Sequence, residues 1–280
     1  MRRWPWLPEP PFDPTHRFHT SWLLSPLHFF LLRALIALYC FVTIFFLLGW
    51  RSTHGMDEAA RRSFSYFTSL TFWGIAFYYA FAAFHTGSFW FAGKPLLARW
   101  PTALQYLHAI FYTTITTFPF VVTIVFWAVL FDTFSTPFDT WSNVTQHALN
   151  LLFAVLEILI PRTERPPVVY VAALVVLLAL YLGLAYITYA TEGFYVYSFL
   201  DDGEVGRGGV AGYCVGILVG TVVVYGLVWL VIWVRLVVTE EKWGMAGKMA
   251  TRRGVVHPGG AEVGEVKDQV EMSESHHSAV

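Results

Sequence analysis

Residues 27–50 read LHFFLLRALIALYCFVTIFFLLGW, an apolar stretch interrupted by a single charged residue, Arg33. An α-helix rises 1.5 Å per residue, so about 20 apolar residues cross the hydrocarbon core of a bilayer. Backbone amides have no water to bond there, and a helix satisfies them within its own segment. This stretch therefore predicts a transmembrane helix and decides the fold class.

Five more runs of spanning length come after it, separated by turn signals: 64–85, 103–131, 142–160, 168–190 and 210–238. The composition agrees, because 56% of the residues are hydrophobic and only 13% are charged, against about 25% in soluble domains. The sequence predicts an all-α polytopic integral membrane bundle of about six transmembrane helices. Residues 1–26 are expected to form a cytosolic segment, 27–238 the membrane domain, and 239–280 a disordered cytosolic tail.

The distribution of Lys and Arg predicts the orientation. With six spans, both termini and the second and fourth loops share one side, which carries twelve basic residues: Arg2, Arg3, Arg17, Lys94, Arg99, Arg162, Arg165, Arg235, Lys242, Lys248, Arg252 and Arg253. The other side carries four: Arg51, Arg61, Arg62 and Arg207. Because cytoplasmic loops are enriched in Lys and Arg, both termini are predicted to be cytosolic. The net charge of −1 and the absence of a basic stripe argue against a nucleic-acid partner.

Polar groups inside the spans are costly and need partners. Arg33 and Glu157 both lie within spans, toward the predicted cytosolic side. They are expected to form a structural ion pair, with Arg162 as the alternative partner of Glu157. Pro119 is expected to kink the third span. Threonine hydroxyls nearby are expected to bond the backbone carbonyls that this proline frees. These threonines are Thr113, Thr114, Thr116 and Thr117.

Thr68 and His147 have matching predicted depths. Each lies six positions after the luminal edge of its helix, at Arg62 and Trp141, which is about 9 Å along the axis. They can therefore occupy one layer of the bundle, close to two helix amino termini that supply positive potential.

Such a layer suits acyl transfer. A threonine hydroxyl attacks an ester once a base removes its proton, and neutral histidine is the usual base. Three carboxylates on the luminal side are alternative groups to orient His147: Asp132, Asp139 and Glu192. The simpler interpretation is that Thr68 bonds its own helix and His147 a neighbouring one.

Three segments carry a family resemblance. They are residues 67–71, FTSLT; residues 118–127, FPFVVTIVFW, followed by His147-Ala148-Leu149-Asn150 and Glu157; and residues 193–201, GFYVYSFLD. In order and rough spacing they resemble the androgen-induced protein family, which includes the androgen-dependent TFPI-regulating protein. Two positions depart from the family pattern. Val144 replaces the first histidine of a His-Gly-x-His pattern, and Ser198 replaces a proline.

The resemblance implies a multi-span hydrolase of endomembranes that cleaves fatty acid esters of hydroxy fatty acids. The endoplasmic reticulum is the favoured location, and the plasma membrane is the alternative. The family's threonine maps onto Thr68, with Thr71 as a competitor, and its histidine onto His147. The resemblance implies membrane lipids and a lipid-ester substrate as partners, no cofactor and no metal, and it identifies no protein partner.

Residues 66–74 also resemble the rolling stone group of multi-span proteins, through Tyr66-Phe67-Thr68-x-Leu70-Thr71-x-Trp73-Gly74. That group implies no established chemistry. The alternatives to the hydrolase are therefore a non-enzymatic multi-span protein and, less favoured, a lipid transporter or lipid-binding bundle.

Overall fold

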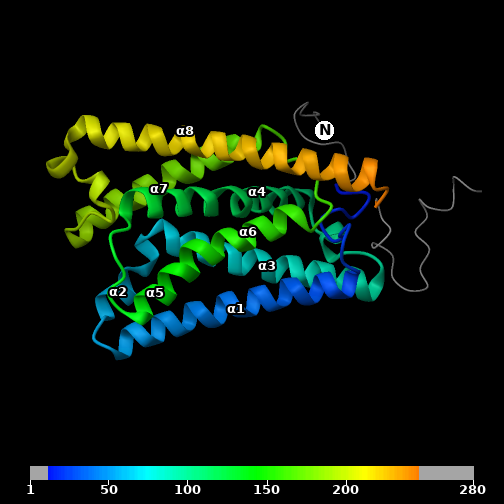
Figure 1. Ribbon diagram of the computed structural model, residues 1–280, viewed down its shortest axis with the longest axis horizontal. Coiled ribbons are helices and arrows are strands. Elements are labelled where there is room, and N and C mark those ends of the chain that lie inside the picture. Colours follow the sequence, from blue (N-terminus) through cyan, green and yellow to red (C-terminus); the bar gives the residue numbers. More distant parts are fainter. Residues whose placement is uncertain (1–11, 246–280) are drawn as a thin grey trace, which may run out of the picture.

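Six long helical runs lie side by side along the long axis of the molecule (Figure 1). The computed structural model describes residues 12–245. Within that range the α-helices are α1 (Pro26–Thr53), α2 (Asp57–Arg61), α3 (Phe67–Ala92), α4 (Thr102–Val125), α5 (Pro137–Asn143), α6 (Asn150–Leu159), α7 (Tyr170–Glu192) and α8 (Asp202–Leu236). Short 3₁₀ turns cover Arg62–Ser65, Leu96–Arg99 and Ser198–Leu200, and π-helical turns cover Phe126–Leu130, Val144–Leu149 and Val237–Lys242.

The two ends of the described chain lie at the same end of the bundle, on the right in Figure 1. There, Arg17 Nη2 lies 2.5 Å from Glu240 Oε1. We call this the proximal end, and the opposite end, which holds the loops 54–66 and 193–201, the distal end. This arrangement fits an even number of crossings.

Five helices are long and apolar enough to cross a membrane: Pro26–Thr53, Phe67–Ala92, Thr102–Leu130, Tyr170–Glu192 and Asp202–Lys242. The predicted α-helical membrane bundle is thus supported. The predicted span 142–160 differs from the others, because it is divided into α5, the π turn Val144–Leu149 and α6. This run still lies within the bundle beside α1 and α4 (Figure 1).

The second span was predicted to end at His85, but α3 continues to Ala92. It ends at Gly93, whose φ of 72° is left-handed and whose N–H bonds Phe89 O at 2.8 Å. His85 is consequently an interior residue with no exposed surface, rather than a residue at a helix end.

Pro119 lies inside α4 and does not end it. The nearby threonines do bond helix carbonyls, but at other positions than predicted. Thr113 donates to Ala109 O and Thr116 to Tyr112 O, both at 2.9 Å. A proline at position 119 has no N–H, so the carbonyl that it frees is that of Ile115, four residues earlier. The carbonyls that the two threonines bond lie before Ile115 in the helix.

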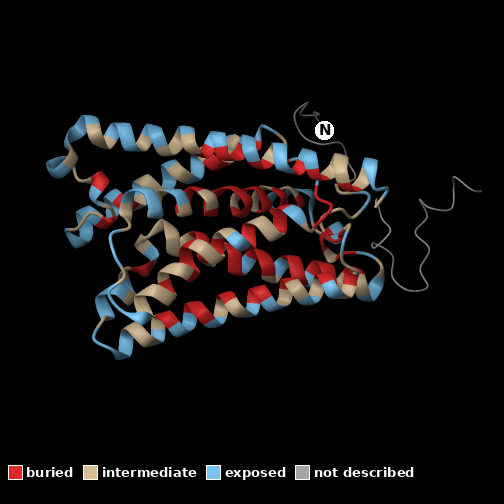
Figure 2. Cartoon of the chain, viewed as in Figure 1, coloured by how far each residue is buried: buried red, intermediate tan, exposed pale blue. Residues whose placement is uncertain are grey.

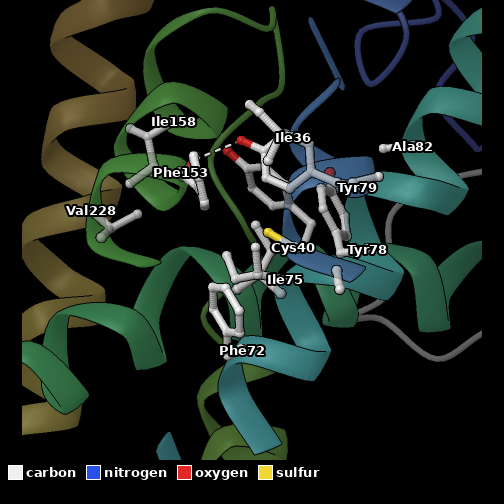
Figure 3. Close-up of a cluster of buried hydrophobic side chains, with 14 of the residues drawn as sticks. Ile36, Cys40, Phe72, Ile75, Tyr78, Tyr79, Ala82, Phe153, Ile158 and Val228 are labelled. Atoms are coloured by element: carbon white, nitrogen blue, oxygen red, sulfur yellow. Dashed lines mark hydrogen bonds between the residues drawn. The ribbon is translucent and has the colours of Figure 1, made fainter. Parts of the chain in front are cut away.

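The apolar core lies where α1, α3, α4, α6 and α8 meet (Figure 2). Figure 3 shows its centre, where Cys40 and Ile75 are fully buried and the Tyr79 hydroxyl donates to Phe153 O at 2.7 Å. Helix α7 takes little part in this core. Of its most apolar stretch 17% is buried, against 44% for both α3 and α4.

Arg33 and Glu157 form the predicted ion pair, and both side chains are buried. Tyr78 donates to Glu157 Oε1 at 2.9 Å, and Arg33 Nη1 donates to Phe18 O at 2.8 Å. The alternative partner, Arg162, lies instead 3.5 Å from Glu240. The pair therefore links α1, α3 and α6 to the N-terminal segment 12–25.

Three imidazoles lie beside this pair. His19 of the N-terminal segment, His85 of α3 and His108 of α4 have ring centroids 5.4 to 6.5 Å apart. All three are buried. Among the described residues, no group of three or more His, Cys, Asp or Glu side chains is arranged to hold a metal ion.

Candidate functional site

An apolar cavity of about 270 Å³ lies toward the distal end, between α4, α7 and α8. Its polar side chains among the described residues are those of Thr68, Tyr181, Tyr197 and Cys214. The rest of the wall is apolar: Phe67, Val121, Val122, Val125, Phe126, Leu130, Val175, Leu178, Ala179, Leu182, Phe199, Leu200, Val215, Ile217 and Leu218. We call it the distal cavity.

Thr68 is the second residue of α3, which starts at Phe67 after the extended residue Tyr66. The first hydrogen bond of this helix runs from Leu70 N to Tyr66 O at 3.1 Å. The amides of residues 67, 68 and 69 consequently have no partner within the helix. Thr68 therefore brings a hydroxyl to the cavity at a point where amide donors and a positive helix end are also present.

Two tyrosine hydroxyls bind these amides. The Phe67 N–H donates to Tyr181 OH at 3.2 Å and to Tyr197 OH at 3.1 Å. Tyr181 in turn donates its proton to Ser65 O at 3.0 Å. Tyr197 also interacts with the hydroxyl and the amide of Thr68. The polar end of the distal cavity is thus a network that joins the start of α3 to α7 and to the loop 193–201.

His147 lies in the π turn Val144–Leu149 and is 5% exposed. Its ring stacks on Phe126, with the centroids 3.5 Å apart and the planes 7° from parallel. Its carbonyl accepts the Thr123 hydroxyl at 2.6 Å. Its Nδ1 has no hydrogen-bond partner among the described residues.

Phe126 belongs to both parts of the predicted site. It lines the distal cavity together with Thr68, and it stacks on His147. Within residues 12–245 no hydrogen bond joins Thr68 to His147. Phe126 begins the π turn Phe126–Leu130, so each ring of the stacked pair belongs to a π turn. Such turns are frequent at functional sites.

Thr71 occupies a different position from Thr68. Its hydroxyl donates to Thr68 O at 2.9 Å and lies 3.5 Å from Asn150 Nδ2. It lines a second apolar cavity of about 640 Å³ between α3, α4 and α7, in which Phe67 and Tyr181 are shared with the distal cavity. Of the two threonines, Thr68 is the one that faces the distal cavity.

None of the three carboxylates that were predicted to be luminal bonds His147 within the described range. Glu192 is 3.0 Å from Arg62 Nε, and Asp132 is exposed. Asp139 lies in the first turn of α5, where its N–H donates to Thr136 Oγ1 at 3.1 Å. The sequence patterns did not identify Phe126 or the two tyrosines as neighbours of the site. Phe126 and Tyr197 do belong to the second and third family-like segments, which gave a signal for them.

No family model matches this chain, and it has no significant match among curated proteins or among solved structures.

Proposed function

We propose that this multi-pass membrane protein is an intramembrane hydrolase of lipid esters. The observation that carries the proposal is the position of Thr68, whose hydroxyl lies at the polar end of an apolar cavity beside the start of α3. An acyl chain fits the apolar wall, and the ester group then lies beside the hydroxyl. The resemblance to the androgen-induced family supports the same residue, and it supports fatty acid esters of hydroxy fatty acids as substrates in an endomembrane such as the endoplasmic reticulum.

In this proposal Thr68 is the nucleophile and His147 is the base. His147 is suited to the role because its Nδ1 has no protein partner in the described range and can accept a proton. Phe126 must turn aside for the two side chains to meet. The movement that the proposal requires is a change of rotamer of Phe126, whose ring lines the cavity and stacks on His147.

The test uses full-length protein in detergent and a chromogenic long-chain ester, p-nitrophenyl decanoate. We expect Thr68→Ala and His147→Ala each to lower the hydrolysis rate at least 10³-fold, of the order seen when a nucleophile or its base is removed. Thr71→Ala is the matched control, because it removes a neighbouring hydroxyl that does not line the cavity, and it should keep activity within about threefold. Full activity in Thr68→Ala would refute the proposal.

A second candidate is a non-catalytic lipid-binding bundle. The stacking of His147 on Phe126 favours it, because within the described residues no hydrogen bond joins His147 to Thr68. This candidate predicts that the wild-type protein binds a fatty acid in the distal cavity and releases no p-nitrophenol.

A further inference from the structure

A small hollow of about 20 Å³ lies between the end of α1 and the start of α3. These two helix ends are both at the distal end of the bundle, where the loop 54–66 joins them (Figure 1). Apolar side chains of α1 and α3 form most of the wall. Its polar side chains among the described residues are those of Arg51, Ser63, Ser69 and Gln146. We call it the Arg51 hollow.

Arg51 brings a positive charge to this hollow without an anionic partner. It lies half-buried in the last turn of α1, and its side chain forms no ion pair and no hydrogen bond with any other described residue. Asp139 is near enough to attract it but forms no ion pair with it. Arg62, at the same end, forms two ion pairs. Because a partly buried charge needs a partner, the Arg51 guanidinium is available to an anion.

Two further donors of the hollow are unused within residues 12–245. The Ser63 hydroxyl is buried and its Oγ has no hydrogen-bond partner. Ser69 is the third residue of α3, so its amide has no partner within the helix. Of the three such amides it is the one that neither Tyr181 nor Tyr197 binds. The start of α3 also has positive potential, so all these features favour a negatively charged ligand.

We propose that the Arg51 hollow binds an oxygen of a phosphate group. The donors are the Arg51 guanidinium, the Ser63 hydroxyl and the Ser69 amide, and a guanidinium matches the geometry of phosphate oxygens. The volume admits about one oxygen, so the rest of the phosphate stays at the mouth of the hollow. A phosphate held there links the end of α1 to the start of α3. The proposal does not depend on ester hydrolysis.

The phosphate has two sources. Arg51 directly follows the apolar stretch 27–50, so it lies at the depth of the lipid headgroups, where Trp and Arg side chains meet the membrane surface. A phospholipid can therefore place its headgroup phosphate at the hollow. Inorganic phosphate can reach the same donors from water. Both sources present the same anionic oxygens to the same three groups.

The experiment titrates full-length protein in detergent and follows the midpoint of thermal unfolding, which rises when a ligand binds the folded state. Dioctanoyl phosphatidylglycerol and dioctanoylglycerol have the same acyl chains, and only the first carries a phosphate. We expect the phosphatidylglycerol to bind at least about tenfold more tightly. Sodium phosphate is then compared with sodium chloride at equal ionic strength. Stabilisation by sodium phosphate identifies free phosphate as a source, and its absence identifies the headgroup; both results support the proposal.

Three variants locate the binding. Arg51→Gln should raise the apparent Kd for phosphatidylglycerol about tenfold, and Ser63→Ala about threefold. Arg61→Gln is the matched control, because it removes an exposed arginine from the same end that does not line the hollow, and it should leave this Kd within about twofold. Each variant is compared with its own ligand-free midpoint, so a change in stability does not affect the result. Equal affinity of the wild type for the two lipids, or equal effects of Arg51→Gln and Arg61→Gln, would overturn the proposal.

Discussion

At the proximal end, charged and imidazole side chains are buried and contact one another, whereas at the distal end α7 stands beside two apolar cavities. The proximal contacts come from α1, α3, α4, α6 and the N-terminal segment, so they fix five segments in one arrangement. The distal half leaves space that a lipid chain can fill. The difference indicates that one half of the bundle provides rigidity and the other provides binding.

The largest effect is expected from separating Arg33 and Glu157. Arg33→Leu or Glu157→Leu alone leaves a buried charge without a partner and should lower the free energy of unfolding by about 3–5 kcal/mol. The double variant should recover most of this loss, because neither charge of this pair then remains buried without its partner. Thermal unfolding of the purified protein in detergent micelles measures both.

The matched control is Arg62→Leu at the distal end. Arg62 pairs with Glu58 and Glu192 at a partly exposed site, so its loss should cost at most about 1 kcal/mol. If Arg62→Leu were as destabilising as Arg33→Leu, the proximal end would have no special role in rigidity.

Replacing one alanine by leucine in each half of the bundle compares how tightly the proximal and distal halves are packed. Ala82→Leu adds volume to a filled core position that is 1% exposed and should cost about 1–3 kcal/mol. Ala179→Leu adds the same volume to the wall of the distal cavity and should change stability by at most about 0.5 kcal/mol. It should nevertheless raise KM for p-nitrophenyl decanoate several-fold. A larger stability loss in Ala179→Leu than in Ala82→Leu would contradict the comparison.

The smallest effect is the pH dependence with which the N-terminal segment docks on the bundle. Two titratable groups of the segment change this docking in opposite directions. Burial raises the pKa of Asp13 to about 6, so its contribution strengthens docking as pH falls through 6. Burial, together with nearby His108 and Arg33, lowers the pKa of His19 well below its usual value, so its contribution weakens docking as pH falls below about 6.5.

Substitution separates these contributions. In Asp13→Asn the histidine contribution remains, and hydrogen-exchange protection of residues 14–24 should fall between pH 7.5 and pH 5. In His19→Gln it should rise over the same interval. Three other titratable groups contact the segment in both variants, so their effects on docking cancel when the variants are compared. They are His16, Glu164 and Glu240. The same pH trend in both variants would exclude the assignment.

Much of the fold can be predicted from patterns that the sequence contains. Apolar length located the helices, and the burial of two opposite charges in separate spans predicted that Arg33 would meet Glu157. The ends were harder to predict. Hydropathy weakens at His85, yet Thr86 donates to Ala82 O at 2.7 Å and α3 continues to Gly93.

For the candidate site, the sequence predicted how far along its helix each residue lies, but not which way its side chain points. Residue counting gives the height of Thr68 and His147 along their helices, but not the face on which each side chain lies. The π turns at Phe126–Leu130 and Val144–Leu149 each add a residue to a turn, which rotates the next part of the chain by about 100° relative to an uninterrupted helix. No feature of the sequence marks those turns, so the stacking of Phe126 on His147 came only from the structure.

The N-terminal segment also constrains how the chain is made. Arg162 N donates to Thr20 O at 3.0 Å, Trp22 Nε1 donates to Leu159 O at 2.7 Å, and Glu240 lies 223 positions after its partner Arg17. Ribosomes add about 5–20 residues per second, so the segment waits roughly 10 to 45 s for the last of these contacts. During that interval its polar groups are bound by water or by another protein. A segment that leaves the ribosome before all six helical runs is therefore among the last parts of the bundle to reach its final position.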